Sequence, residues 1–163
     1  MKILIVSLLS LAVVGCASSK AATRTDEVAA VPVNDGYQVQ FPQPPSYEQS
    51  AYQGHPLHRF SIATGSVTYT LSHATIPGMS ASFVGGSIKD LAKTHGFELV
   101  SFQDITLPNT QAAQSFVGKR EKFTISGIGC AAGDRLYHVM TEHDAADATQ
   151  VAASQAFIAS FKP

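Results

Sequence analysis

Apolar and polar residues alternate with a period of two over much of the chain from residue 37 onward. This alternation is typical of β-strands with one face against a core, because successive side chains point to opposite faces. It predicts a first strand over residues 37–41, ended by prolines, and two antiparallel hairpins joined by turns that contain glycine. The hairpin strands are predicted at residues 58–63 and 67–76, and at residues 122–131 and 136–142.

Two more strands, over residues 97–107 and 113–118, are predicted around a turn at Pro108. The strand over 136–142 differs from the others because apolar residues occupy both of its parities. Such a strand is covered on both faces of its sheet. The residues concerned are Leu136 and Met140 on one side, and Tyr137 and Val139 on the other.

Helical spacing appears in two places. After the candidate caps Ser80 and Ser82, four residues recur at spacings of 4, 3 and 4, and Gly96 follows where a helix end favours a left-handed residue. These four residues are Val84, Ile88, Leu91 and His95. A second helix is predicted over residues 145–161, with an apolar stripe that packs on a sheet.

The first residues of the chain have a different pattern. Lys2 is followed by an apolar run to residue 15 whose only polar residue type is serine. This run is too short for a hydrocarbon core that needs about 20 residues, so residues 1–15 are predicted to be an export signal. The ending "VVGC" resembles the bacterial lipobox, which implies cleavage between Gly15 and Cys16 and a diacylglycerol thioether on Cys16. An ordinary signal peptide that happens to end in cysteine is the alternative.

Residues 16–35 form the predicted link between this anchor and the rest of the chain. They are rich in Ala, Ser and Thr and have no periodic apolar pattern, so we expect a flexible tether that spans about 20–25 Å. Two or three acyl chains on Cys16, at about 0.8 kcal/mol per buried CH₂, would hold the protein firmly on a bilayer. Ala17 stands where aspartate resembles the inner-membrane retention signal, which favours the outer membrane, facing the periplasm. A single domain is expected over residues 36–163.

Composition narrows the classes of function. The chain has 163 residues and a formal net charge of −1, and 45% of its residues are apolar. A packed core is therefore expected, and nucleic acid is not an expected partner because phosphate binding needs a concentrated basic field. The basic run Lys119, Arg120 and Lys122 is interrupted by Glu121 and is interpreted as a solvated strand face.

The residues that could carry chemistry do not form a known catalytic motif. If Cys16 is acylated, Cys130 is left as a single thiol in an apolar strand, and we interpret it as a small buried residue. The six histidines show no metal-ligand spacing, so we predict no metal and expect them to be solvent-exposed or to face a partner. There is no G-x-S-x-G or G-x-G-x-x-G motif, and neither catalytic residues nor cofactors are predicted.

Several stretches together resemble bacterial PsbP-like lipoproteins, a group that includes DcrB-like proteins. They are "YQVQFPQPP" at the start of the domain, "AAQSFVGKREKF", "GDRLYHVM", and "ASQAFIASFKP" at the end. The resemblance implies an α+β fold, an α/β/α sandwich with an antiparallel sheet of about six or seven strands and two main helices. It also implies a non-enzymatic envelope protein. Asp134, where asparagine is frequent, and the absence of a Pro-Gly turn before the middle strand depart from the pattern.

Two hypotheses of function follow. The favoured one is a lipid-anchored cell-envelope protein that acts as a non-enzymatic binding or assembly module for an envelope protein partner. The alternative is a small-ligand-binding protein or small hydrolase, with its site between a proline-rich loop over residues 42–56 and the sheet. The side chains expected to line that surface are Tyr47, Tyr52, His55 and His58.

Overall fold

The computed structural model describes residues 29–30 and 36–163. The described strands form a seven-stranded antiparallel sheet in the order β3-β4-β5-β9-β8-β7-β6, and a separate pair of β1 and β2. The strands are β1 (Ala29–Ala30), β2 (Gln40–Phe41), β3 (Ser46–Tyr52), β4 (His55–Thr64), β5 (Val67–Thr75), β6 (Glu98–Asp104), β7 (Ala112–Arg120), β8 (Phe123–Ala132) and β9 (Arg135–Asp144). The helices are α1 (Phe83–His95) and α2 (Ala148–Ala159).

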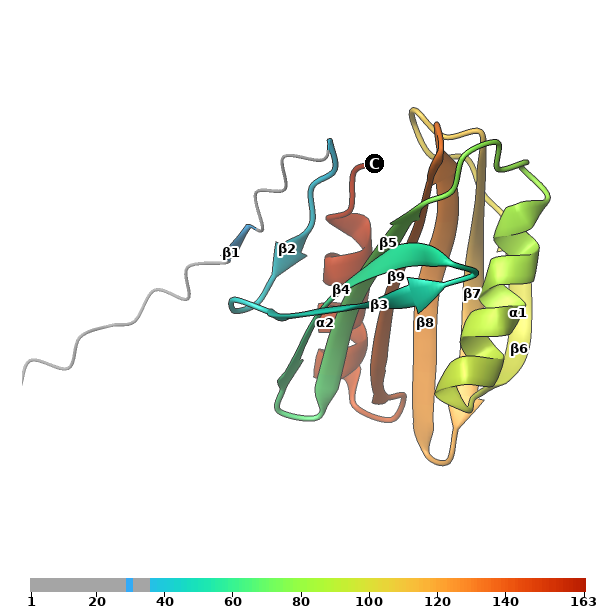
Figure 1. Cartoon of the computed structure of the whole chain (residues 1–163). Coiled ribbons are helices and arrows are strands. Elements are labelled where there is room, and N and C mark those ends of the chain that lie inside the picture. The colour runs from blue at the N-terminus through green and yellow to red at the C-terminus, as the bar shows by residue number, and fades with distance from the viewer. Residues whose placement is uncertain (1–28, 31–35) are drawn as a thin grey trace, which may run out of the picture.

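The two helices lie on opposite faces of the large sheet (Figure 1). α1 packs on β6, β7 and β8, whereas α2 packs on β5, β8 and β9. We call these two sides of the sheet the α1 face and the α2 face. The arrangement is the α+β sandwich of a seven-stranded antiparallel sheet and two helices that was expected. Because α1 lies toward the β6 end, β3 and β4 reach it through long side chains such as Tyr52 and Arg59 and are not packed directly beneath it.

Each face of the sheet carries its own apolar core, and β9 contributes to both. Leu136 belongs to the core on the α1 face, together with Ile88 of the helix. Tyr137 and Val139 belong to the core on the α2 face, together with Phe157. The prediction that this strand is covered on both sides is therefore confirmed, and it follows from apolar residues at both parities.

The helix ends follow from local hydrogen bonding. Gly96 has φ of 65° and its N–H bonds to the carbonyl of Ala92, so α1 ends where the sequence predicts. α2 begins at residue 148 rather than 145, because the Asp147 carboxylate accepts hydrogen bonds from the N–H groups of Thr149 and Gln150. Ser82, in contrast, makes no side-chain hydrogen bond to the first turn of α1.

The predicted first strand over residues 37–41 is shorter than expected. Only Gln40 and Phe41 form a strand, which pairs with β1, and Gln38 forms an isolated bridge with Lys162. The alternation still describes burial correctly, because the three apolar side chains of this segment all lie in the core on the α2 face. They are Tyr37, Val39 and Phe41. The segment packs beside the end of α2 and not within the large sheet, which limits its strand pairing (Figure 1).

The expected proline-rich loop over residues 42–56 is wrong. It contains β3 and the tight turn that joins β3 to β4, with Gly54 at φ of 83°. β3 was missed because its residues are exposed on both faces, apart from the half-buried Tyr52, so no apolar alternation marks it.

Neither α1 nor α2, the helices found in the described part of the chain, has the length and apolar character needed to cross a membrane.

Candidate functional site

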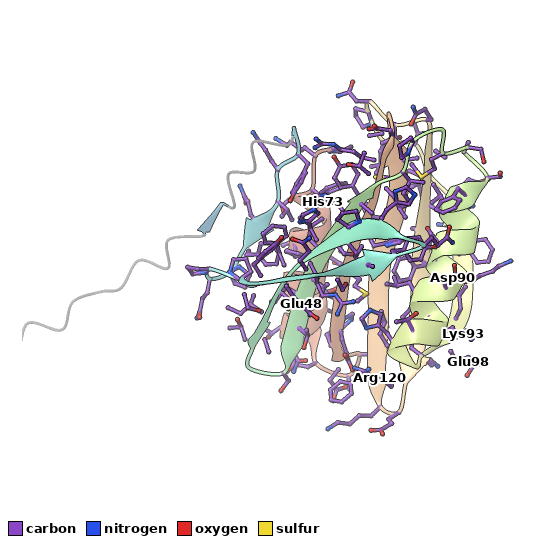
Figure 2. All side chains as sticks on the ribbon, viewed as in Figure 1. Glu48, His73, Asp90, Lys93, Glu98 and Arg120 are labelled. Atoms are coloured by element: carbon purple, nitrogen blue, oxygen red, sulfur yellow. The ribbon has the colours of Figure 1, made fainter. Side chains whose placement is uncertain are left out.

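A cleft of about 260 Å³ lies on the α1 face beside the end of α1. It exists because α1 covers only the β6 end of the sheet, so side chains of β4, β5 and β9 stand beside the helix end and not beneath it. Its lining combines charged groups, hydroxyls and apolar side chains: Arg59, Ser61, Thr68, Thr70, His95, Phe97, Arg120, Ile125, Met140, Thr141 and Glu142. Figure 2 shows Arg120 near the lower end of α1 and Glu48 on the β3 side.

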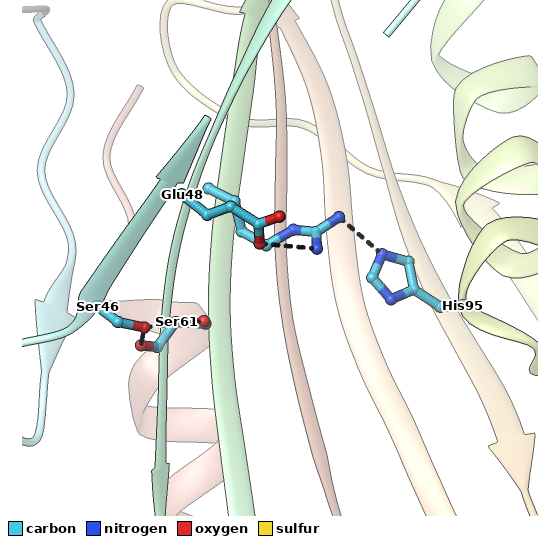
Figure 3. A network of polar contacts seen from close by, with 5 residues as sticks. Ser46, Glu48, Ser61 and His95 are labelled. Carbon is cyan, nitrogen blue, oxygen red and sulfur yellow. Dashed lines mark hydrogen bonds and ion pairs between the residues drawn. The ribbon is translucent and has the colours of Figure 1, made fainter. Parts of the chain in front are cut away.

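Arg59 of β4 contacts Glu48 of β3 and His95 of α1, the two residues that carry the ends of the polar network labelled in Figure 3. Its Nη1 is 3.6 Å from Oε2 of Glu48, and its Nη2 is 3.3 Å from Nε2 of His95. Its Nε is buried and has no hydrogen-bond partner among the residues that the structure describes. Because a guanidinium only donates, His95 accepts through Nε2 and is a neutral imidazole.

Arg120 of β7 has a fuller set of partners. Its Nε is 3.1 Å from Oε1 of Glu142, its Nη2 contacts Oε2 of the same carboxylate, and its Nη1 donates to the backbone carbonyl of His95 at 3.0 Å. This bidentate pair joins β7 to β9 and holds the end of α1. Burial, followed by the charges of Arg59 and Arg120, lowers the pKa of His95.

A smaller cavity of about 50 Å³ adjoins the cleft under α1. At its wall Ser87 Oγ lies 2.9 Å from Nε2 of His138, and Ser87 Oγ also donates to the carbonyl of Val84 at 2.7 Å. The single hydroxyl proton is thus used, so Nε2 of His138 donates to Ser87 and does not act as its base. Burial also lowers the pKa of His138 to about 4. This pair is a structural contact and not an activated nucleophile.

The four residues predicted to line one surface are divided between two faces. Tyr47 and His58 lie on the α2 face, where Tyr47 Oη is 2.8 Å from Nδ1 of His58. Tyr52 lies on the α1 face, with Oη donating to Asp90 at 2.9 Å, and His55 is its cross-strand neighbour. The structure thus brings them together as two pairs, and their part in binding stays a prediction.

The expectation that the histidines are solvent-exposed or face a partner is wrong for three of the six. His73, His138 and His143 are at most 6% exposed. They lie on β5 and β9, the two central strands, where neighbouring strands and helices cover both faces. The prediction of a buried Cys130 is confirmed, and burial raises the pKa of its thiol to about 12. Gly15 and Cys16 lie outside the described residues.

Sequence reasoning missed the residues that meet in the cleft. The helical spacing places His95 in the apolar stripe of the first helix, and the basic run places Arg120 on a solvated strand face. The sequence pattern does not single out Arg59 or Glu142 as candidate site residues. Their meeting depends on the pairing order of strands that are far apart in sequence, which no local pattern contains. Within the described residues, no group of three or more His, Cys, Asp or Glu side chains could hold a metal ion.

The two edges of the sheet differ in regularity. β3 pairs with β4 in unbroken register from Ser46–Ser61 to Tyr52–His55, and its other side has no neighbouring strand in the described residues. β6, at the opposite edge, has a register shift between Leu99 and Ser101. It also carries a charged residue at each end, Glu98 and Asp104, whereas β3 carries only Glu48.

Comparison with known proteins shows the fold. The sequence matches no protein-family profile and no curated protein. The structure is similar to the solution structure of cyanobacterial PsbP (CyanoP) from Synechocystis sp. PCC 6803, with a TM-score of 0.56 and 12% identity over 90% of this chain and 98% of that one. A protein of unknown function, PA94 from Pseudomonas aeruginosa, aligns with a TM-score of 0.46 and 14% identity over 78% of this chain and 90% of that one. The chain therefore has a PsbP-like fold.

Proposed function

We propose that this protein is a non-enzymatic binding module of the bacterial cell envelope, anchored through a lipid on Cys16, that binds a protein partner along the free edge of β3. The observation that carries the proposal is the contrast between the two edges of the sheet. An edge strand exposes a row of backbone N–H and C=O groups, and proteins usually protect such edges by bulges or charges. β6 has both kinds of protection, whereas β3 is regular and has one charge.

A partner suited to this edge supplies an extended segment that adds to the sheet as an eighth strand. Main-chain hydrogen bonds then provide affinity, and alternate side chains provide specificity. Tyr47, 54% exposed, would offer an apolar contact on the α2 face, and Glu48 would offer a carboxylate on the α1 face. We therefore expect the partner segment to place an apolar side chain opposite the tyrosine and a basic one opposite Glu48.

The exposed apolar residues near the other edge do not form an equivalent surface. Phe102 pairs with Phe116 on the α1 face and has the Lys89 ammonium 5.6 Å from its ring centre. Val117 is on the opposite face, and Val100 lies at the register shift. Singly exposed apolar side chains of this kind are common on protein surfaces.

The anchor follows from the sequence "VVGC" and from the tether over residues 16–35. A lipid on Cys16 would place the domain within a short tether length of the bilayer and would raise the effective concentration of a membrane-bound partner. Replacing Cys16 by serine is expected to move the protein from the membrane fraction to the soluble fraction of cells and to remove labelling by fatty acid. Unchanged membrane association of Cys16→Ser would contradict the anchor.

The partner is tested with two matched serine variants. Ser50 and Ser101 are exposed residues within β3 and β6, so Ser50→Lys and Ser101→Lys add the same charge to opposite edges. Inward or edge lysines hinder strand addition. We expect Ser50→Lys to reduce co-purification of the envelope partner with the full-length chain by at least about ten-fold, and Ser101→Lys to leave it unchanged. Equal effects of both variants would refute the edge as the binding site.

A further inference from the structure

The cleft beside α1 opens on the face of the sheet and not along the backbone edge of β3, although Glu48 of β3 contacts Arg59 of its lining. It has features of a small-molecule site. Its volume of about 260 Å³ is a little below the roughly 300–1,000 Å³ that ligand pockets span, so it suits a small ligand. Such pockets have mostly apolar walls with a few polar groups that fix orientation. Here the apolar wall is formed by Phe97, Ile125 and Met140, and the hydroxyls come from Ser61, Thr68 and Thr70.

The two arginines of the cleft are in different states. Arg120 has a bidentate carboxylate partner and a backbone carbonyl, so its charge is neutralised and its position is fixed. Among the described residues, the one ion-pair partner of Arg59 is Glu48, whose side chain is 65% exposed, at 3.6 Å. An ion pair at that distance with an exposed partner is weak and screened by salt. Arg59 is therefore the cation with capacity for another anion.

His95 helps to fix the position of the Arg59 guanidinium in the lining of the cleft. Its neutral Nε2 accepts from Nη2 of Arg59 at 3.3 Å, which ties the guanidinium of β4 to the end of α1. The buried Nε of Arg59 has no acceptor among the described residues, and buried donors in proteins are normally paired. Because Nε is enclosed, a ligand in the cleft meets the terminal nitrogens: Nη1 is 3.6 Å from Glu48 and Nη2 is 3.3 Å from His95, so each keeps a second N–H. A guanidinium matches a carboxylate with two parallel hydrogen bonds, and a planar anion could accept both of these N–H groups.

Charge and shape together limit the ligand. The lining holds two guanidinium groups and one carboxylate, Glu142, which gives the cleft one net positive charge. Glu48 lies outside the lining with its side chain 65% exposed, where solvent weakens its effect on that charge, so the cleft favours a ligand with a single negative charge over a dianion. We infer that the cleft binds a small organic monocarboxylate, with its carboxylate on Arg59 and its apolar part against Phe97, Ile125 and Met140. This site takes a small acid and does not depend on the protein partner proposed for β3.

The test uses benzoate as the probe and benzamide as its neutral counterpart, titrated into the purified full-length chain in detergent and followed by NMR. We expect benzoate to bind with a dissociation constant in the millimolar range or tighter and to shift signals of Arg59 and His95, while benzamide binds at least about ten-fold more weakly. Equal binding of the two compounds, or no binding of benzoate, would overturn the inference. This comparison needs only the unmodified protein.

Two charge-neutralising variants locate the site. Arg59→Gln is expected to weaken benzoate binding by about ten-fold or more, because it removes the cation that faces the cleft. Lys93→Gln removes the same charge from an exposed residue in the last turn of α1, outside the lining, and is expected to leave binding unchanged. Equal losses in both would mean that benzoate responds only to overall charge. Inorganic phosphate should not compete, and competition as strong as that of benzoate would overturn the monocarboxylate class.

Discussion

His138 lies in the middle of β9 with its imidazole against Ser87 of α1, and its burial determines its chemistry. An imidazolium in that position would lose its hydration without gaining a carboxylate, since Nε2 contacts the hydroxyl of Ser87. The native protein therefore keeps His138 neutral. This explains how a serine and a histidine can lie within hydrogen-bond distance without forming a catalytic pair.

The lowered pKa of His138 predicts destabilisation in mild acid. As pH falls below the unfolded value of about 6.5, the unfolded chain binds a proton that the native state does not bind until its pKa of about 4. On the order of 3 kcal/mol of the free energy of unfolding should be lost across this window through His138. Urea unfolding at pH 7.5 and pH 4.5 measures this decrease in the free energy of unfolding. If the free energy of unfolding of a His138→Gln variant falls equally steeply, the decrease does not come from His138.

Two glycines illustrate how strongly single positions depend on their surroundings. A Cβ on Gly127 of β8 would lie 2.5 Å from the Phe116 ring and 2.7 Å from the carbonyl of Val139, whereas a Cβ on Gly86 of α1 would meet nothing within 4 Å. Gly127→Ala is expected to lower the free energy of unfolding by roughly 1–3 kcal/mol. Gly86→Ala should raise it by up to about 1 kcal/mol, because alanine favours a helix interior. Urea unfolding measures the free energy of unfolding of both variants. Equal changes in the two variants would refute the packing argument.

At the scale of elements, the two helices differ in how they begin. Asp147 accepts hydrogen bonds from the first turn of α2, and the backbone N–H and then the side chain of Gln150 lower the pKa of its carboxyl. Ser82 makes no such bond to α1. We expect Asp147→Ala to lower the free energy of unfolding at pH 7 by more than Ser82→Ala does.

The pH dependence of this cap has a defined sign. Because the native pKa of Asp147 lies below its unfolded value of about 3.9, its contribution is complete above that value and is lost as pH falls through the native pKa. The difference between the parent and Asp147→Ala should therefore shrink in strong acid. A difference that is constant from pH 7 to pH 3 in urea unfolding would show that the carboxylate does not act as a cap.

The elements differed in how far the sequence predicts them. The β4–β5 and β8–β9 hairpins were predictable because alternation and glycine turns agree, and α1 because its spacing ends at Gly96. β3 was not, because an exposed edge strand has no buried face to impose alternation. The cleft was not predictable either, since Arg59, His95 and Arg120 come from three elements whose contact is set by strand order.

At the scale of the whole molecule, the offset of the helices produces both proposed surfaces. α2 supports the centre of the sheet on one face, and α1 supports only the β6 end of the other. The β3–β4 hairpin therefore forms the other end of the sheet (Figure 1). β3 has a free edge among the described residues, and Arg59 and Ser61 of β4 line the cleft. The same arrangement that completes two apolar cores leaves this hairpin available for binding.

The most direct test of the proposed function is site-specific photo-crosslinking in intact cells. A photo-reactive phenylalanine derivative is placed at Ser50 on β3 or at Ser101 on β6 of the full-length, membrane-anchored protein. We predict that Ser50 gives a reproducible crosslink to one envelope protein, and that Ser101 gives none. Crosslinks of equal yield from both edges, or a crosslink from Ser101 alone, would contradict the assignment of β3 as the partner-binding edge.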